Sequence, residues 1–311
     1  MYDSLLFGNG LTKAVLASIK NNYPCKFSHY LDCDAFIHDF INAEHHPEIF
    51  IVHKEDRDYI QKHFGKIVLY GFERWVSENI FSTDNEFKNA KFILYILYNY
   101  WYDLINEAIL KLPIPTNIIT QIGETVLKSL HKGAKIFTTN FDTLLDSVLH
   151  PDHIHGTFQL PLPDLNDTVA FNVNEQEFEW KYLFGTNGLE KLSRLDRIKK
   201  TQAEEYDIDF FYDNTIDLGN LLIYGLSFGR AEFISDEFLR QYPQHKDVTL
   251  VRTVDGHILL KLSQKRELNK LKRITISYYK ESEIDHYKEM FEDTNLEDIV
   301  EYLPSHEMFD F

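Results

Sequence analysis

The chain has few cysteines, few basic residues and no long apolar run. Its 2 cysteines cannot build a disulfide framework or a four-cysteine zinc site. Its 32 Lys and Arg stand against 49 Asp and Glu, and the formal net charge of −17 opposes binding to nucleic acid or to an anionic membrane. The longest apolar run, residues 92–98, is far shorter than the roughly 20 residues of a membrane helix. With no secretory signal visible, we expect a cytoplasmic protein held together by packing.

Strand and helix patterns alternate along the 311 residues. Residues 3–7 are an apolar strand that leads into a glycine turn, and residues 13–20 then have helical spacing, an order that begins many nucleotide-binding sheets. The other expected strands are 134–138, 220–224, 248–254, 257–262 and 273–279, with a hairpin turn at 255–256. The other expected helices include 116–131 (with Gly133 at its exit), 143–149, 232–241 and the acidic C-terminal segment. The pattern predicts a single α/β domain with a Rossmann-like, mostly parallel sheet and a mostly helical insertion at residues 34–131.

Four short clusters are candidates for chemistry, and three of them directly follow expected strands, where open parallel sheets bind ligands. Gly-Asn-Gly at 8–10 is either a phosphate-binding turn or a plain tight turn. Thr-Thr-Asn-Phe-Asp at 138–142 either caps the next helix or faces the crevice, and its Asn and Asp could divide these roles. His-Ile-His-Gly at 153–156 has the spacing of a metal-binding pair, but no third ligand is evident nearby. Gly-Leu-Ser-Phe-Gly at 225–229 is a small-residue turn or a second phosphate or ribose cradle.

Taken in this order, the four clusters resemble the sirtuin (Sir2) superfamily. The resemblance covers residues 1–15 and 134–240 and is closest to the Sir2-like domains of bacterial antiphage defence, which cleave NAD instead of deacylating proteins. Its most specific part is Asn-x-Asp followed by His-Gly. It implies a Sir2-like fold that takes NAD as its substrate and uses no metal.

The resemblance also implies roles for individual residues. Asn140 matches the catalytic asparagine, which positions water or the ribose hydroxyls. Asp142 matches the acidic residue that contacts the nicotinamide carboxamide. His155, directly before the glycine, matches the catalytic histidine, whereas His153 matches no family residue. The residues that would bind the phosphates and riboses of NAD are Gly8, Asn9, Gly10, Thr12, Thr139, Gly225 and Ser227.

The chain departs from the family pattern at three points. The four-cysteine zinc module is missing, because Cys25 and Cys33 both precede Asn140, and this argues against a standard protein deacylase. Asn9 stands where the family commonly has alanine. The arginine-bearing loop after the glycine motif is not recognisable.

The residue types suit cleavage of the nicotinamide–ribose bond, which passes through an oxocarbenium-like state. Hydrolysis to ADP-ribose and nicotinamide is the expected reaction, and cyclisation would use much the same residues. Since unrestrained NAD cleavage would poison the cell, we expect control by a protein partner encoded nearby, by a homo-oligomer, or by both. The aromatic segment at 95–102 is a candidate contact surface or core of the insertion. The alternatives are a non-catalytic module that senses NAD or ADP-ribose or scaffolds a partner, and a zinc-independent deacylase.

Overall fold

The structure is a computed structural model. It describes residues 1–25, 28–31, 112–140, 142–154, 213–228 and 256–309, together with residues 35, 36, 39, 40, 58, 101, 104 and 211. The strands are β1 (Tyr2–Phe7), β2 (Leu130–Thr138), β3 (Asp152–His153), β4 (Gly219–Tyr224), β5 (Leu271–Tyr278) and β6 (Val300–Pro304). The helices are α1 (Asn9–Ile19), α8 (Thr116–Leu127), α9 (Asp146–Leu149), α13 (Gly256–Glu267) and α14 (Ser282–Phe291). Short 3-10 turns are η1 (Ser28–Leu31), η7 (Glu297–Ile299) and η8 (Ser305–Glu307).

These six strands form one sheet in the order β3-β2-β1-β4-β5-β6, and every pairing is parallel. The chain therefore builds outward from β1 through β2 to β3, returns to the other side of β1, and builds outward again through β4, β5 and β6. This is the strand order of the doubly wound dinucleotide-binding fold, whose ligand crevice lies where the direction of winding reverses. Here the reversal falls between β1 and β4. The predicted Rossmann-like parallel sheet is confirmed.

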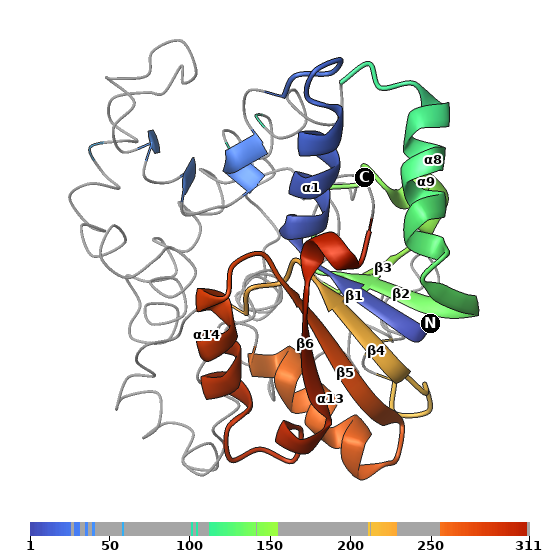
Figure 1. The fold of residues 1–311 in the computed structure, drawn as a ribbon, viewed down its shortest axis with the longest axis vertical. Coiled ribbons are helices and arrows are strands. Elements are labelled where there is room, and N and C mark those ends of the chain that lie inside the picture. The colour runs from blue at the N-terminus through green and yellow to red at the C-terminus, as the bar shows by residue number, and fades with distance from the viewer. Residues whose placement is uncertain are drawn as a thin grey trace, which may run out of the picture.

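Helices cover the two faces of the sheet, as Figure 1 shows, with α1 and α8 on one side and α13 and α14 on the other. Side chains alternate between the faces along each strand. In β1, Leu5 and Phe7 pack with α1 and α8, whereas Leu6 joins the cluster around α13 and α14. All three are buried, as expected for a central strand covered on both faces.

Several expected elements have different bounds or a different type. The helix after the first glycine turn begins at Asn9, earlier than expected, and the short helix after residue 143 begins only at Asp146. The strand expected at 134–138 already begins at Leu130, so Gly133 lies inside β2 with a φ of +81° and is not a helix exit. The C-terminal segment contains the predicted helix, α14, but also the edge strand β6, which was not predicted.

The strand expected at 257–262 is wrong, because these residues belong to α13. An apolar run of this length fits a strand, yet Ile258, Leu259 and Leu262 are spaced as one face of a helix and are buried in the core on that side of the sheet. The hairpin expected at 255–256 is therefore wrong as well, since a helix begins at Gly256. The strand at 248–254, the helix at 232–241, and most of the insertion at 34–131 lie outside the described residues. Of the segment 95–102 only Trp101 is described: it is buried, and its indole nitrogen donates to the Tyr30 carbonyl at 2.6 Å.

Candidate active site at the carboxyl edge of the sheet

Glycines from two strand ends meet at the point where the winding reverses. Gly8 and Gly10 follow β1, Gly225 follows β4, and the Gly10 amide donates a 2.9 Å hydrogen bond to the Gly225 carbonyl. A Cβ atom built on Gly225 would lie 2.5 Å from the Gly10 Cα, and one built on Gly8 would lie 2.7 Å from the Gly225 oxygen. Gly225 also has a φ of +63°, which side chains rarely allow. We call these three residues the glycine seam.

Several backbone groups of the seam are already hydrogen-bonded. The Gly10 amide binds the Gly225 carbonyl, and the Leu11 amide donates to the Gly8 carbonyl at 3.0 Å, so two amides of the first turn of α1 are occupied. The Gly10 carbonyl also accepts a 3.0 Å bond from the half-exposed Tyr279 hydroxyl. A phosphate at this seam would therefore use the remaining amides at the start of α1 or displace these contacts.

Three other residues predicted to bind the cofactor have separate positions at this edge. The Asn9 side-chain amide donates to the Leu31 carbonyl at 2.8 Å, so it joins α1 to η1. The Thr139 amide donates to the Phe7 carbonyl at 3.1 Å and extends the β1–β2 pairing. Ser227 is exposed, beyond the seam. The structure thus places all three at the carboxyl edge without bringing them into one group.

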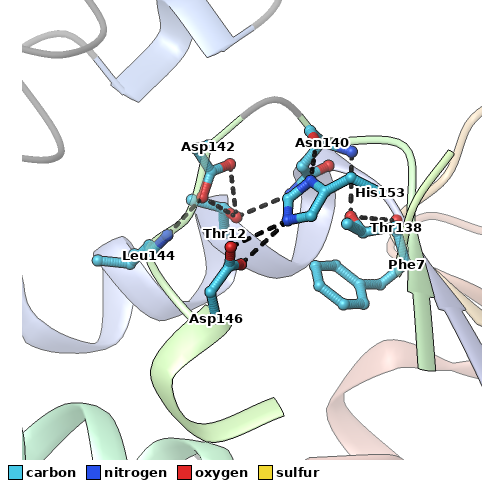
Figure 2. A network of polar contacts seen from close by, with 8 residues as sticks. All are labelled: Phe7, Thr12, Thr138, Asn140, Asp142, Leu144, Asp146 and His153. Atoms are coloured by element: carbon cyan, nitrogen blue, oxygen red, sulfur yellow. Dashed lines mark hydrogen bonds and ion pairs between the residues drawn. The ribbon is translucent and has the colours of Figure 1, made fainter. Parts of the chain in front are cut away.

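Thr12, Asn140 and Asp142 do form one group, which we call the polar cluster (Figure 2). The Thr12 hydroxyl donates to the Asp142 carboxylate, with oxygen–oxygen distances of 3.1 and 3.3 Å, and accepts a 2.9 Å bond from the Asn140 side-chain nitrogen. All three side chains are buried. Thr12 lies on the same helix start as Gly10, so α1 connects the polar cluster to the glycine seam.

Asn140 has one polar atom without a partner. Its amide nitrogen donates to the Thr138 hydroxyl at 3.0 Å, its carbonyl contacts Nδ1 of His153 at 2.7 Å, and its side-chain nitrogen binds Thr12. Its Oδ1 atom has no hydrogen-bond partner in the part of the chain that the structure describes, although the residue is only 1% exposed. A buried acceptor left unpaired costs about 1–3 kcal/mol, so a ligand that donates to it would recover that energy.

The Asp142 carboxyl is positioned to titrate close to neutral pH. Burial raises its pKa from 3.8 to about 6, against the opposing hydrogen bonds from the Leu144 amide and Thr12. The Leu144 amide donates a 3.2 Å hydrogen bond to the Asp142 carboxylate and stabilises the turn before α9. Neither Asn140 nor Asp142 caps the helix itself, because the N-cap residue is Leu145 and it has no side-chain cap hydrogen bond. Perturbed titration in a buried cluster at a strand end is typical of functional sites.

His153 and Asp146 complete the network, and the sequence predicted a role for neither in this site. Nε2 of His153 lies 3.0 and 3.2 Å from the two Asp146 carboxylate oxygens. Burial alone would lower the pKa of His153, but the hydrogen bond and charge of Asp146 raise it above the ordinary 6.5. Asp146 follows Asp142 by four positions, a spacing that would put both carboxylates on one side of the helix expected at 143–149, although α9 begins only at Asp146. His155 lies outside the described residues.

The site therefore offers a buried hydrogen-bond acceptor, a carboxyl group that changes charge near pH 6, and a glycine-lined backbone at the crevice of a doubly wound sheet. This combination suits a nucleotide-like ligand that carries a phosphate and a hydroxyl or amide donor.

In the described part of the chain, no three His, Cys, Asp or Glu side chains gather as metal ligands, and no helix is long and apolar enough to span a bilayer. Comparison of the chain with protein-family models, curated proteins and solved structures finds no match.

Proposed function

We propose that the protein hydrolyses NAD to ADP-ribose and nicotinamide, as a gated effector of bacterial antiphage defence. The order of its sequence clusters, which resembles that of Sir2-like NAD-cleaving domains, motivates the proposal. The observation that carries it is the unpaired Oδ1 of Asn140, beside a titrating carboxyl group at the crevice of a doubly wound sheet. A resting protein gains nothing from a buried, unpaired acceptor, whereas an enzyme can use it to orient a ribose hydroxyl or a water molecule.

In this proposal each residue has a defined task. Asn140 accepts a hydrogen bond at Oδ1 from the attacking water or a ribose hydroxyl. Asp142, ionised above its pKa of about 6, accepts from the carboxamide of nicotinamide and places negative charge near the developing cation. The glycine seam gives the pyrophosphate close access to the backbone. His155 remains the predicted base, by resemblance alone.

Nicotinamide leaves as a neutral base, so the site needs no strong acid to expel it. The demands on the protein are geometry and charge stabilisation, since bond cleavage builds positive charge on the ribose. A rigid acceptor and a nearby carboxylate meet both demands. Cyclisation of the ADP-ribose would place the same demands on the site, and product analysis separates the two reactions.

The test is nicotinamide release from NAD by the purified chain, alone and mixed with the products of adjacent genes. We expect Asn140→Ala to reduce turnover by about 100- to 1,000-fold, as removal of one oriented catalytic hydrogen-bonding group does elsewhere, and His155→Ala to abolish it. The matched control is His150→Asn, because His150 is exposed at the end of α9 and adopts a left-handed conformation that asparagine tolerates.

The outcomes separate the two classes of function. Release only in a mixture would identify the gating partner. Binding of NAD or ADP-ribose without release under any condition would contradict the enzyme and favour the sensing or scaffolding module. Removal of an acyl group from a peptide only when NAD is present would favour a deacylase.

A further inference from the structure

His153 lies between two hydrogen-bond acceptors. Its Nδ1 atom is 2.7 Å from the Asn140 carbonyl oxygen, and its Nε2 atom is 3.0 Å from an Asp146 carboxylate oxygen. Carbonyl and carboxylate oxygens only accept, so each ring nitrogen must donate. The side chain is only 9% exposed, so water can replace neither contact easily. With the Asp146 carboxyl ionised, both contacts form together only when His153 is the doubly protonated cation.

The same contacts fix the backbone of Asn140. His153 binds its carbonyl from β3, while the Thr138 hydroxyl accepts from its amide at the end of β2. The pairing of Thr138 with His153 in the β2–β3 register brings these contacts to the same place. Asn140 is held on both sides, while its Oδ1 atom has no hydrogen-bond partner among the described residues.

We propose that Asp146 and His153 form a positioning pair, in which the Asp146 carboxylate keeps His153 doubly protonated so that its other N–H holds the Asn140 carbonyl. The effect of this pair on turnover rests on the proposed function, whereas its contacts do not depend on it. The pair touches no reacting atom. It acts through the orientation of Asn140.

Deprotonation of His153 breaks this arrangement in either tautomer. If Nδ1 keeps the proton, a lone pair on Nε2 faces the Asp146 carboxylate; if Nε2 keeps it, a lone pair on Nδ1 faces the Asn140 carbonyl. Two carboxylates, Asp146 on α9 and Asp142 after β2, act on this ring, and both raise its pKa. Turnover should therefore fall as the pH rises through that raised pKa, whereas Asp142 titrates on the acid side, near 6.

Replacing Asp146 with asparagine removes the carboxylate charge and introduces an amide that can donate a hydrogen bond. A neutral His153 can then donate from Nδ1 to Asn140 and accept at Nε2 from the new amide, so both contacts survive without a charge. We expect Asp146→Ala to lower kcat by about 10- to 100-fold, because a small displacement of Asn140 spoils alignment. Asp146→Asn should recover part of that loss and remove the alkaline fall in turnover. A merely structural contact would not produce that change in pH profile.

The experiment combines three readouts on the full chain. Nitrogen-15 NMR of labelled histidine, with His153 assigned from the spectrum of His153→Gln, reports which ring nitrogens carry protons. Hydrogen exchange of peptides containing Asn140 reports how firmly that segment is held. The pH profile of nicotinamide release reports turnover. Glu124→Gln is the matched control, since it removes one exposed charge on α8 and should leave all three readouts unchanged.

We expect both ring nitrogens of His153 to be protonated in the wild type near pH 7, and only Nδ1 in Asp146→Asn. Peptides containing Asn140 should exchange faster in Asp146→Ala. Identical titration of His153 with and without the Asp146 carboxylate, or unchanged exchange, would overturn the positioning pair even if NAD is cleaved. Should the ring and exchange results be as expected while no NAD is cleaved, the pair stands and the proposed function falls.

Discussion

The glycine seam and the polar cluster lie at the same edge of the sheet and are built in opposite ways. At the seam, backbone packs on backbone, and the amides of Gly10 and Leu11 have partners within the chain. In the polar cluster, side chains hydrogen-bond to one another, yet Asn140 Oδ1 has no partner among the described residues, and burial raises the pKa of Asp142. The seam is held by contacts within the chain, whereas the cluster keeps one buried acceptor open for the donor that the proposed function requires. Substitutions in the glycine seam should therefore mainly change the stability of the fold, whereas substitutions in the polar cluster should mainly change function.

The largest effect should come from a side chain placed in the seam. Gly225→Ala adds a Cβ atom 2.5 Å from the Gly10 Cα, at a φ of +63°, and should lower the free energy of unfolding by about 3–5 kcal/mol. Gly133→Ala is the matched control, because Gly133 has a φ of +81° but no atom within 4 Å of its Cβ position, and should cost about 1–2 kcal/mol. Urea unfolding measures both. Equal losses would show that the approach at the seam is not tight.

The next effect should be a gain in stability within the polar cluster. Asp142→Asn removes a buried carboxyl whose pKa rises from 3.8 to about 6 on folding, a change equivalent to about 3 kcal/mol at pH 7. Because the folded-state pKa is raised, the carboxyl costs nothing below about pH 4, where it is protonated in both states, and the cost of ionisation develops between about pH 4 and pH 6 and is complete above 6. The variant should thus be more stable than the wild type at pH 7 and equal to it near pH 4. A difference that does not vary with pH would contradict the buried ionisation.

A smaller change in the free energy of unfolding is expected from substitutions at Asn140 and at Thr138, the residue whose hydroxyl its amide contacts, and the loss should be larger at Thr138. Thr138→Val leaves the buried Asn140 amide without its acceptor and should cost about 1–3 kcal/mol. Asn140→Ala loses the bond to Thr12 but also removes the unpaired Oδ1, so the free energy of unfolding should change by about 1 kcal/mol or less. Unfolding of the two variants in urea tests this. A large loss in Asn140→Ala would mean that Oδ1 has a partner in the resting protein.

The smallest effect should come from Tyr279→Phe. The hydroxyl of this half-exposed side chain donates to the Gly10 carbonyl, and such a bond contributes about 0.5–1 kcal/mol. Because Tyr279 contacts the seam from the residue after β5, loss of its hydroxyl should leave the polar cluster unaltered. Urea unfolding together with the histidine NMR signal of His153 checks both statements, and a change in that signal would show that the two regions are coupled.

The sequence predicts that Gly8, Gly10 and Gly225 follow strands, and strand ends in a parallel sheet converge on one edge. It does not predict the direct contact of Gly10 with Gly225, which depends on β1 and β4 being neighbours. Thr12, Asn140 and Asp142 were each named, but their mutual contact depends on β1 and β2 being neighbours, which no local pattern states. His153 and Asp146 were missed for the same reason, since their contacts follow from the pairing of β3 with β2. The catalytic role of His155 stays a prediction.

The central position of β1 in the sheet also determines the order in which the site can assemble during synthesis. Residues 2–7 are made before either of the strands that flank β1, so β1 gains both its neighbours only after residues 130–138 and 219–224 have been made. Thr12 likewise meets Asp142 across 130 positions of sequence. Gly10 can close against Gly225 only after β4 has been made. A growing chain therefore cannot assemble the glycine seam or the polar cluster from local segments, and this edge of the sheet forms only after long-range strand pairing.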